Sequence, residues 1–338
     1  MYQLITALAA VFVFMMVIMF HEFGHFITAK MVGIKVHEFA IGMGPRIFHK
    51  TKGETEYSIR ALPIGGYVKM EGEDESSDDP NSFNKKPIGS RILVVVAGAI
   101  MNFILAIIVF GIISYVMGMP TTVIDEVIVD TPAYKAGLEP GDKIINVNNK
   151  EINSWNNVIK EINNVEPKKD IEIIVLRGSE KKSFTLKPKF DKETGRYLIG
   201  ITTKTNKSFT SAVKGGVEKT GEILGAMFEF FRMLVTGEIK KGSLSGPVGV
   251  IYTVGQAAKY GFMNILYITG LISVNLGFFN LLPIPALDGG RILFMLIELF
   301  RGEPLDPEKE GFIHFVGFVL LIILMIYVTY SDIVKFFG

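Results

Sequence analysis

Four long apolar stretches, separated by polar segments, organise this sequence. The pattern predicts membrane-spanning helices over residues 1–28, 91–119 and 310–332, and an interrupted one over residues 263–300. A helix needs about 20 mostly apolar residues to cross the hydrocarbon core of a bilayer, and each stretch is long enough. The first stretch has no basic residues at its start and no small-residue cleavage site, so we expect a retained helix rather than a signal peptide.

The third stretch is interrupted by residues that do not suit a helix. Asn280 is followed by Pro283 and Pro285, and then by Asp288 and two glycines. Proline removes an amide donor and breaks a helix, and irregular backbone at membrane depth is tolerated only where it lines protein or a watery cavity. We therefore expect Asp288 to have a strong partner, for which a metal ion is the best candidate.

The polar segment of residues 29–90 changes to the period of β-structure. Residues 56–60 alternate between apolar and polar, and residues 65–70 follow a Pro-Ile-Gly-Gly turn signal, which together predict short strands of a small sheet. Residues 37–45 are glycine-rich and poorly suited to a helix. The alternative is a plain connecting loop.

The segment of residues 120–205 predicts a separate α+β domain. Short strands are expected at residues 124–129, 143–147, 171–176 and 183–186. Residues 132–148 resemble the A-G-L-x-x-G-D-x-I-x-x-V-N core of bacterial PDZ domains, and one such unit is visible. PDZ domains bind extended peptides by adding a strand to a sheet edge, so a peptide or protein ligand of this groove is expected.

The segment of residues 206–262 combines Lys and Glu with apolar residues at helical spacing. We expect an amphipathic helix at the membrane surface over residues 208–242, followed by a kinked connection. The alternative is a helix packed on the PDZ unit or on the spanning helices.

Composition supports a membrane protein and excludes some chemistry. Hydrophobic residues make up 49% of the chain, and the mean hydropathy is +0.37. The net charge of +1 gives no reason to expect nucleic acid as a partner. The absence of cysteine excludes disulfides and thiol catalysis.

The first apolar stretch ends in His21-Glu22-Phe23-Gly24-His25, an H-E-x-x-H pattern. On a helix His21 and His25 share one face and can hold one metal ion. In this chemistry two neutral imidazoles bind Zn²⁺, the metal acidifies a bound water, and the carboxylate of Glu22 takes the proton. A chance match or a surface cluster is the alternative, but such residues are costly in a membrane-length apolar stretch.

A catalytic zinc keeps three protein ligands and one open position, so a third ligand is needed. We predict Asp288, the carboxylate beside the backbone break. His37 and His49 are weaker alternatives because neither has helical spacing to the first pair. We expect Glu38 and Glu54 to be solvated rather than catalytic.

Other polar residues in the apolar stretches are open to two interpretations. Asn102 is either a functional group or a helix–helix hydrogen bond. Asn280 or Asn102 could donate a hydrogen bond to the oxyanion of a reacting peptide. His314 is expected to be a core or interfacial histidine rather than a ligand.

A substrate helix must unwind before it can be cut, because its carbonyl groups are hydrogen-bonded. An exposed edge in the sheet of residues 56–70, which contains Gly66 and Tyr67, could hold the unwound segment as an added strand. This is a hypothesis about how substrate reaches the metal.

Basic residues predict the orientation. They are frequent between residues 30 and 91 and absent from residues 1–20. The positive-inside rule then places the first loop in the cytoplasm, with both termini and the PDZ unit outside and the metal site near the cytoplasmic side.

These features together resemble the site-2 protease family of intramembrane zinc metalloproteases, in its bacterial regulator of sigma-E protease branch. The resemblance rests on the H-E-x-x-H pattern, residues 39–45, residues 60–67, the PDZ core and residues 280–291. It implies that His21, His25 and Asp288 bind zinc, that Glu22 is catalytic, and that Asn280 contacts substrate. It also implies that residues 56–70 form a membrane-associated β element.

The expected fold is a polytopic α-helical membrane protein with four transmembrane helices, a small cytoplasmic-side β element and one inserted α+β PDZ domain. The resemblance implies a zinc endopeptidase of the bacterial plasma membrane. Such enzymes cut transmembrane segments of single-span substrates, anti-sigma factors or remnant signal peptides, in regulated intramembrane proteolysis. Two other functions compete: an inactive scaffold that recruits a partner through the PDZ unit, and a metal-ion transporter, against which the chain shows no inverted repeat.

Overall fold

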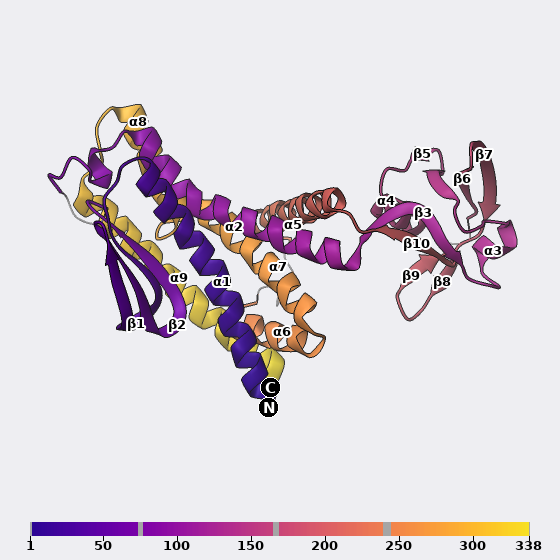
Figure 1. Ribbon diagram of the computed structural model, residues 1–338, viewed down its shortest axis with the longest axis horizontal. Helices are drawn as coiled ribbons and strands as arrows, with labels where there is room; N and C mark the ends of the chain where they lie inside the picture. The colour runs from indigo at the N-terminus through magenta and orange to yellow at the C-terminus, as the bar shows by residue number, and fades with distance from the viewer. Residues whose placement is uncertain (1, 74–76, 165–168, 239–244, 338) are drawn as a thin grey trace. The chain divides into compact units, whose positions relative to one another are not determined.

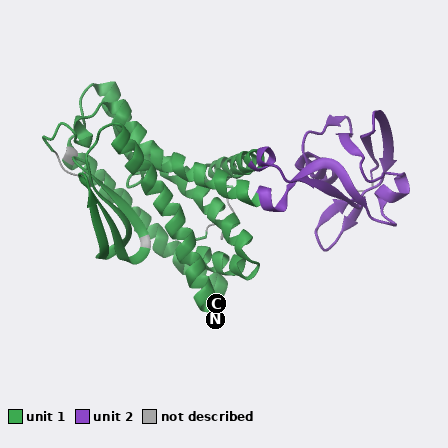
Figure 2. Ribbon diagram, viewed as in Figure 1, with its two compact units in different colours: residues 1–113, 213–338 green, residues 114–212 purple. Residues whose placement is uncertain are grey.

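The computed structural model describes residues 2–73, 77–164, 169–238 and 245–337. The chain divides into two units (Figure 2), residues 1–113 with 213–338 and residues 114–212. Each unit has its own hydrophobic core, and we describe each by itself.

Within the described residues of unit 1, four helices are long and apolar enough to cross a membrane. The spans within these helices are Gln3–Met31, Ile88–Met117, Phe262–Leu281 and Glu308–Phe336. The helices themselves are α1 (Tyr2–Met31), α2 (Ile88–Met117), α7 (Phe262–Leu281) and α9 (Pro307–Phe337) (Figure 1). The four predicted spans are therefore present.

Helices α1, α2 and α7 pack together around buried aliphatic side chains. Val17 of α1, Leu105 and Val109 of α2 and Leu266 of α7 form one cluster. Small residues allow close approach: a side chain on Gly24 would collide with the backbone of α2 at Ala97. The two helices that carry most of the candidate site are thus in direct backbone contact.

The break in the third stretch is also present. Helix α7 ends at Leu281, and a separate helix α8 (Asp288–Arg301) begins after a short connection. Arg91 at the start of α2 forms an ion pair with Glu298 of α8, at 2.5 Å. Helix α8 therefore lies against the beginning of α2.

Between α1 and α2, the chain forms two long strands, β1 (Val36–Lys52) and β2 (Thr55–Met70). Residues 38–41 pair with residues 66–69 on one side and with residues 56–59 on the other. Residues 46–52 pair with residues 55–60. In this register, residues 66–70 form one edge of the sheet.

The predicted strands at residues 56–60 and 65–70 are both part of β2, so the expected turn between them is a bend within a strand. The strand β1 was missed, because its glycine-rich sequence does not show a β period. Gly42 and Gly44 have positive φ angles of 86° and 84°, which other residues rarely adopt and which let β1 bend.

The sheet packs on the helices through a second core. Phe26 of α1, Val36 of β1, Met70 of β2 and Val94 of α2 are among its buried members, with Met295 of α8. This core fixes the sheet beside the end of α1 that carries the H-E-x-x-H pattern.

Two helices follow the strands of unit 2: α5 (Phe209–Thr236), which begins within unit 2 and continues into unit 1, and α6 (Pro247–Lys259). Ile223 of α5 is buried against Phe110 of α2 and Val274 of α7. Helix α5 thus packs on the spanning helices, and its place at the membrane surface stays a prediction. Helix α6 begins within the expected connection at residues 242–249, of which residues 242–244 lie outside the described part.

Unit 2 holds a sheet with strand order β10-β3-β4-β6-β7, in which β5 also pairs with β4. The strands are β3 (Met119–Val127), β4 (Lys143–Val147), β5 (Lys150–Glu151), β6 (Ile171–Arg177), β7 (Glu180–Leu186) and β10 (Ile201–Asn206). Two short helices, α3 (Pro132–Ala136) and α4 (Trp155–Asn163), and a hairpin of β8 (Lys189–Asp191) with β9 (Arg196–Leu198) complete it. This is the expected α+β unit, and each predicted strand is present.

Candidate metal centre

The two histidines of the H-E-x-x-H pattern lie on one face of α1, near its end. His21 and His25 are four residues apart, and their Nε2 atoms are 3.2 Å from each other. Only 7% of His21 and 9% of His25 is exposed. Helical spacing explains why both rings point to the same place.

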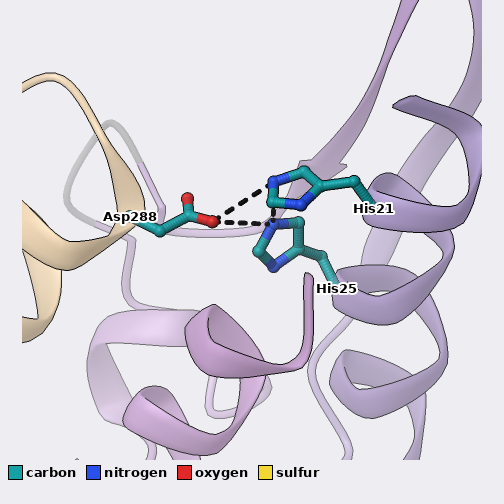
Figure 3. A group of neighbouring side chains, drawn as sticks. All are labelled: His21, His25 and Asp288. Carbon is teal, nitrogen blue, oxygen red and sulfur yellow. Dashed lines mark hydrogen bonds and ion pairs between the residues drawn. The ribbon is translucent and has the colours of Figure 1, made fainter. Parts of the chain in front are cut away.

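Asp288 is the first residue of α8, and it reaches the same place from a distant part of the chain. Its Oδ2 atom lies 3.2 Å from His21 Nε2 and 3.5 Å from His25 Nε2. Figure 3 shows the two imidazoles of α1 facing this carboxylate. Within the described residues, these three form the only group of His, Asp and Glu side chains able to share a metal ion.

The connection before Asp288 is held in an unusual shape. Ala286 has a φ angle of 77°, which is uncommon for a residue with a side chain. Its backbone N–H donates a hydrogen bond to His314 Nδ1 of α9, at 2.9 Å. His314 is therefore not part of the metal cluster, and its contact supports the turn that brings Asp288 to the histidines.

The three atoms fit a divalent cation such as Zn²⁺. The 3.2–3.5 Å separations agree with a tetrahedral zinc site, where bonds of about 2.0–2.1 Å place ligands about 3.3–3.4 Å apart. The Oδ2 atom of Asp288 is buried without a hydrogen-bond partner among the described residues. Lone pairs this close repel one another, and a cation among them removes the repulsion.

Helix α2 contacts both histidines. The Nδ1 atom of His25 donates to the Val94 carbonyl oxygen, at 2.9 Å. A side chain on Gly98 would overlap the rings of both histidines. The Nδ2 atom of Asn102 lies 3.3 Å from His21 Nδ1, and Asn102 is completely buried.

Glu22 faces the sheet. A Cβ atom placed on Gly66 would lie 3.6 Å from Glu22 Cγ and 2.8 Å from the Ala40 carbonyl oxygen. The edge of the sheet at residues 66–70 is thus next to the carboxylate that the sequence predicts to be catalytic.

A second polar cluster stiffens the sheet near this edge. Glu38 accepts hydrogen bonds from Ser58 Oγ at 2.5 Å, Tyr67 Oη at 2.6 Å and Arg60 Nη2 at 2.7 Å. Burial alone would raise the pKa of Glu38, but these donors outweigh it and hold the pKa at about 2. Burial and the hydrogen bond to Glu38 raise the pKa of Tyr67 to about 12.

This cluster corrects one expectation. Glu38 is not solvated, because only 8% of it is exposed. Its partners come from β2, and no local pattern in the sequence predicts them. By contrast, Glu54 is largely exposed and pairs with Lys30 at 2.6 Å, as a solvated residue does.

The other predicted site residues are only partly brought together. Asn102 reaches His21 and Gly66 reaches Glu22. The Tyr67 hydroxyl is engaged by Glu38 and Arg60. Asn280 is buried in the last turn of α7, and its substrate contact stays a prediction.

The two alternative histidines have partners of their own. His37 Nε2 is 2.5 Å from Glu71, and His49 Nδ1 is 3.0 Å from Glu56. The contribution of the Val94 carbonyl was missed, because a backbone group leaves no signal in the sequence. Gly98 has no side chain to mark it as part of the site, although the room it leaves is what admits both histidine rings.

Comparison with known proteins gives matches over nearly the whole chain. The model of peptidase family M50 matches residues 9–324. A Clostridium acetobutylicum protein assigned as a zinc metalloprotease is 39% identical over 327 residues, with 96% of each chain covered. The regulator of sigma-W protease RasP of Bacillus subtilis is 32% identical over 418 residues, with 98% of this chain and 99% of the relative covered.

Among solved structures, the PDZ domain of the SdrC-like protein of Listeria monocytogenes is similar to part of the chain. It is 25% identical with a TM-score of 0.22, and the match covers 25% of this chain and 86% of that one.

Proposed function

The chain belongs to peptidase family M50, the site-2 protease family, and from this premise we propose that it cuts transmembrane segments of other membrane proteins. It is a metalloendopeptidase, and its relatives are named zinc metalloproteases. We propose that His21, His25 and Asp288 hold Zn²⁺ and that Glu22 is the catalytic carboxylate.

One observation carries the proposal: ligand atoms from two distant helices converge. His21 and His25 of α1 and Asp288 of α8 place three ligand atoms within 4.8 Å of one another. Both histidines are buried and Asp288 is partly buried, close to helices that can span a membrane, where unpaired polar atoms are costly. The Oδ2 atom of Asp288 faces two imidazole nitrogens and has no hydrogen-bond partner among the described residues, which a bound cation would account for.

Glu22 performs the proton transfers. When bound, Zn²⁺ would supply Lewis-acid chemistry by polarising the scissile carbonyl and lowering the pKa of water. Glu22 takes a proton from the attacking water and returns it to the leaving amine. Its place between the two histidines and the sheet edge at Gly66 supports this role.

The edge of the sheet holds the substrate in an extended form. Residues 66–70 pair with β1 on one side in the observed register, and no other strand among the described residues pairs with them, so a strand can be added there. A strand added there lies beside Gly66, and hence beside Glu22. Asn280 and Asn102 remain candidate donors to the oxyanion, and Tyr67 supports the edge through Glu38.

The substrates are single-span membrane proteins. A relative is named regulator of sigma-W protease, which supports an anti-sigma factor as substrate, with remnant signal peptides as a second group. The PDZ domain of unit 2 binds a peptide or protein ligand. We propose that the chain lies in a bacterial plasma membrane with its termini and PDZ domain outside and its metal centre near the cytoplasmic side.

A comparison of the full-length protein with its Glu22→Gln variant tests the mechanism. Both are placed in liposomes with a model single-span substrate, and bound zinc is quantified in both. We expect cleavage by the wild type and a loss of about 100-fold to 10,000-fold in the variant, because proton transfer is lost. Zinc content is expected to be unchanged, because Glu22 is not a ligand.

The matched control is Glu54→Gln, which removes an exposed carboxylate outside the metal centre and is expected to cleave like the wild type. Equal cleavage by wild type and Glu22→Gln would mean that Glu22 is not the base. Zinc retained without any cleavage would favour a scaffold. Zinc transport into the liposomes, unaffected by Glu22→Gln, would favour a transporter.

Disulfide formation between enzyme and substrate tests the sheet edge. The chain has no cysteine, so Lys69→Cys places a single thiol on an exposed position of the edge. In the Glu22→Gln background, substrates with single cysteines near the cleavage site should cross-link with a period of two residues. Lys52→Cys, in the segment that pairs with residues 55–60, is the control and should not cross-link. Equal cross-linking at both positions, or no period, would contradict the added strand.

A further inference from the structure

Three residues of α2 form a stripe that faces the metal ligands. Val94, Gly98 and Asn102 follow one another at intervals of four and therefore share one face of the helix. Val94 contacts His25 through its carbonyl oxygen, Gly98 leaves room for both rings, and Asn102 contacts His21. Helix α2 thus contacts His25 through a backbone carbonyl and His21 through a side-chain amide.

The hydrogen on each imidazole decides what each contact must be. A histidine that offers Nε2 to a metal carries its hydrogen on Nδ1, and this N–H needs an acceptor. His25 satisfies the rule, because its Nδ1 donates to the Val94 carbonyl oxygen at 2.9 Å. His21 must satisfy the same rule if its Nε2 is to face the cation.

At His21 the amide of Asn102 stands where the acceptor belongs. Its Nδ2 atom, a donor, lies 3.3 Å from His21 Nδ1, while its Oδ1 atom is buried without a hydrogen-bond partner among the described residues. Amide nitrogen and oxygen are told apart only by their hydrogen bonds. A 180° turn of this amide gives His21 its acceptor and gives the orphaned oxygen a donor.

We infer that Asn102 is a positioning residue, whose Oδ1 accepts the Nδ1 hydrogen of His21 and so holds the tautomer that binds metal. The inference rests on the proposed zinc centre. It differs from the sequence-based assignment of Asn102 to substrate or oxyanion. The backbone of Asn102 is held by helix α2, and Ser273 Oγ of α7 also donates a hydrogen bond to its carbonyl oxygen, at 2.8 Å.

Zinc affinity of two full-length variants tests the direction of the hydrogen bond. Asn102→Asp keeps an oxygen acceptor and removes the donor, whereas Asn102→Leu removes both at similar size. We expect Asn102→Leu to lose about 10-fold to 100-fold in zinc affinity, measured by competition with a chelator. Asn102→Asp should bind at least as tightly as the wild type, and the Co²⁺ absorption spectrum should change only in the Leu variant.

Ser273→Ala is the matched control, since it removes the bond to the Asn102 backbone and leaves the amide in place; its zinc affinity should stay close to that of the wild type. Wild-type affinity in Asn102→Leu, or an equal loss in both Asn102 variants, would overturn the inference and leave the zinc centre standing. A wild type that binds no zinc would overturn both.

A measurement on the wild type alone guards against a variant that does not fold. In zinc-loaded protein with ¹⁵N-labelled histidine, the Nδ1 atom of His21 should carry a proton. An unprotonated Nδ1 at His21 would overturn the inference without any substitution.

Discussion

Unit 1 contains two buried polar clusters that differ in how their charges are satisfied. Around Glu38 in the sheet, both carboxylate oxygens accept hydrogen bonds from neighbouring side chains. Around Asp288, one carboxylate oxygen faces two imidazole nitrogens and has no hydrogen-bond donor among the described residues. Protein groups alone satisfy the charge of the first cluster, whereas the second leaves an oxygen that the proposed cation would satisfy.

Hydrogen-bond satisfaction therefore distinguishes structural polar groups from functional ones. A satisfied network contributes stability and orientation, so its loss is expected to lower the stability of the fold. An unsatisfied set of ligand atoms lowers stability unless a cation binds, so its loss is expected to lower the affinity for that cation. Each cluster is therefore expected to respond to a different measurement.

Among tests of the contrast between the two clusters, Gly98→Ala has the largest expected effect. The new methyl group would overlap the rings of His21 and His25, which are both held in place by α2. Overpacking of about 1–3 kcal/mol corresponds to a loss of roughly 10-fold to 100-fold in zinc affinity. Chelator competition measures it in the full-length protein.

Gly89→Ala is the matched control on the same helix, because a side chain there would meet open space. It should bind zinc like the wild type. If Gly98→Ala also keeps wild-type zinc affinity, the metal centre does not depend on the close approach of α2, and the contrast between the clusters is weakened.

The next effect is on stability. Glu38→Gln removes the charge that Ser58, Arg60 and Tyr67 satisfy. Hydrogen bonds to charged groups contribute about 1.5–3 kcal/mol, so we expect Tm in detergent to fall by roughly 3–10 °C. Zinc affinity should not change. A loss of zinc with unchanged Tm would reverse the roles assigned to the two clusters.

The smallest effect is a dependence on pH. The folded pKa of Glu38 is about 2, below its usual value of 4.5. The group therefore adds stability that is complete above pH 4.5 and is lost as pH falls toward 2. The Tm difference between wild type and Glu38→Gln should shrink over that range. A difference that stays constant from pH 6 to pH 3 would contradict the assignment.

Much of the architecture could be predicted, because it depends on local patterns. The four spans follow from runs of apolar residues, and the strands of unit 2 follow from their alternation. Strand β1 escaped prediction because its glycines hide the β period, and the sequence left two alternatives open for α5 because an amphipathic face does not say what covers it. Glu38 was misjudged because its three partners lie on another strand, which no local pattern reveals.

Helical periodicity is local, so the spacing of residues 21–25 is enough to place His21 and His25 on one helix face with Glu22 beside them. The break beside Asp288 also pointed to the third carboxylate, but only the tertiary packing shows how it reaches the histidines, which carbonyl orients His25, and that Gly66 lies against Glu22. Those contacts join segments far apart in the chain. Their geometry depends on how whole helices and a sheet pack, because only packing brings such segments within hydrogen-bond or ligand distance.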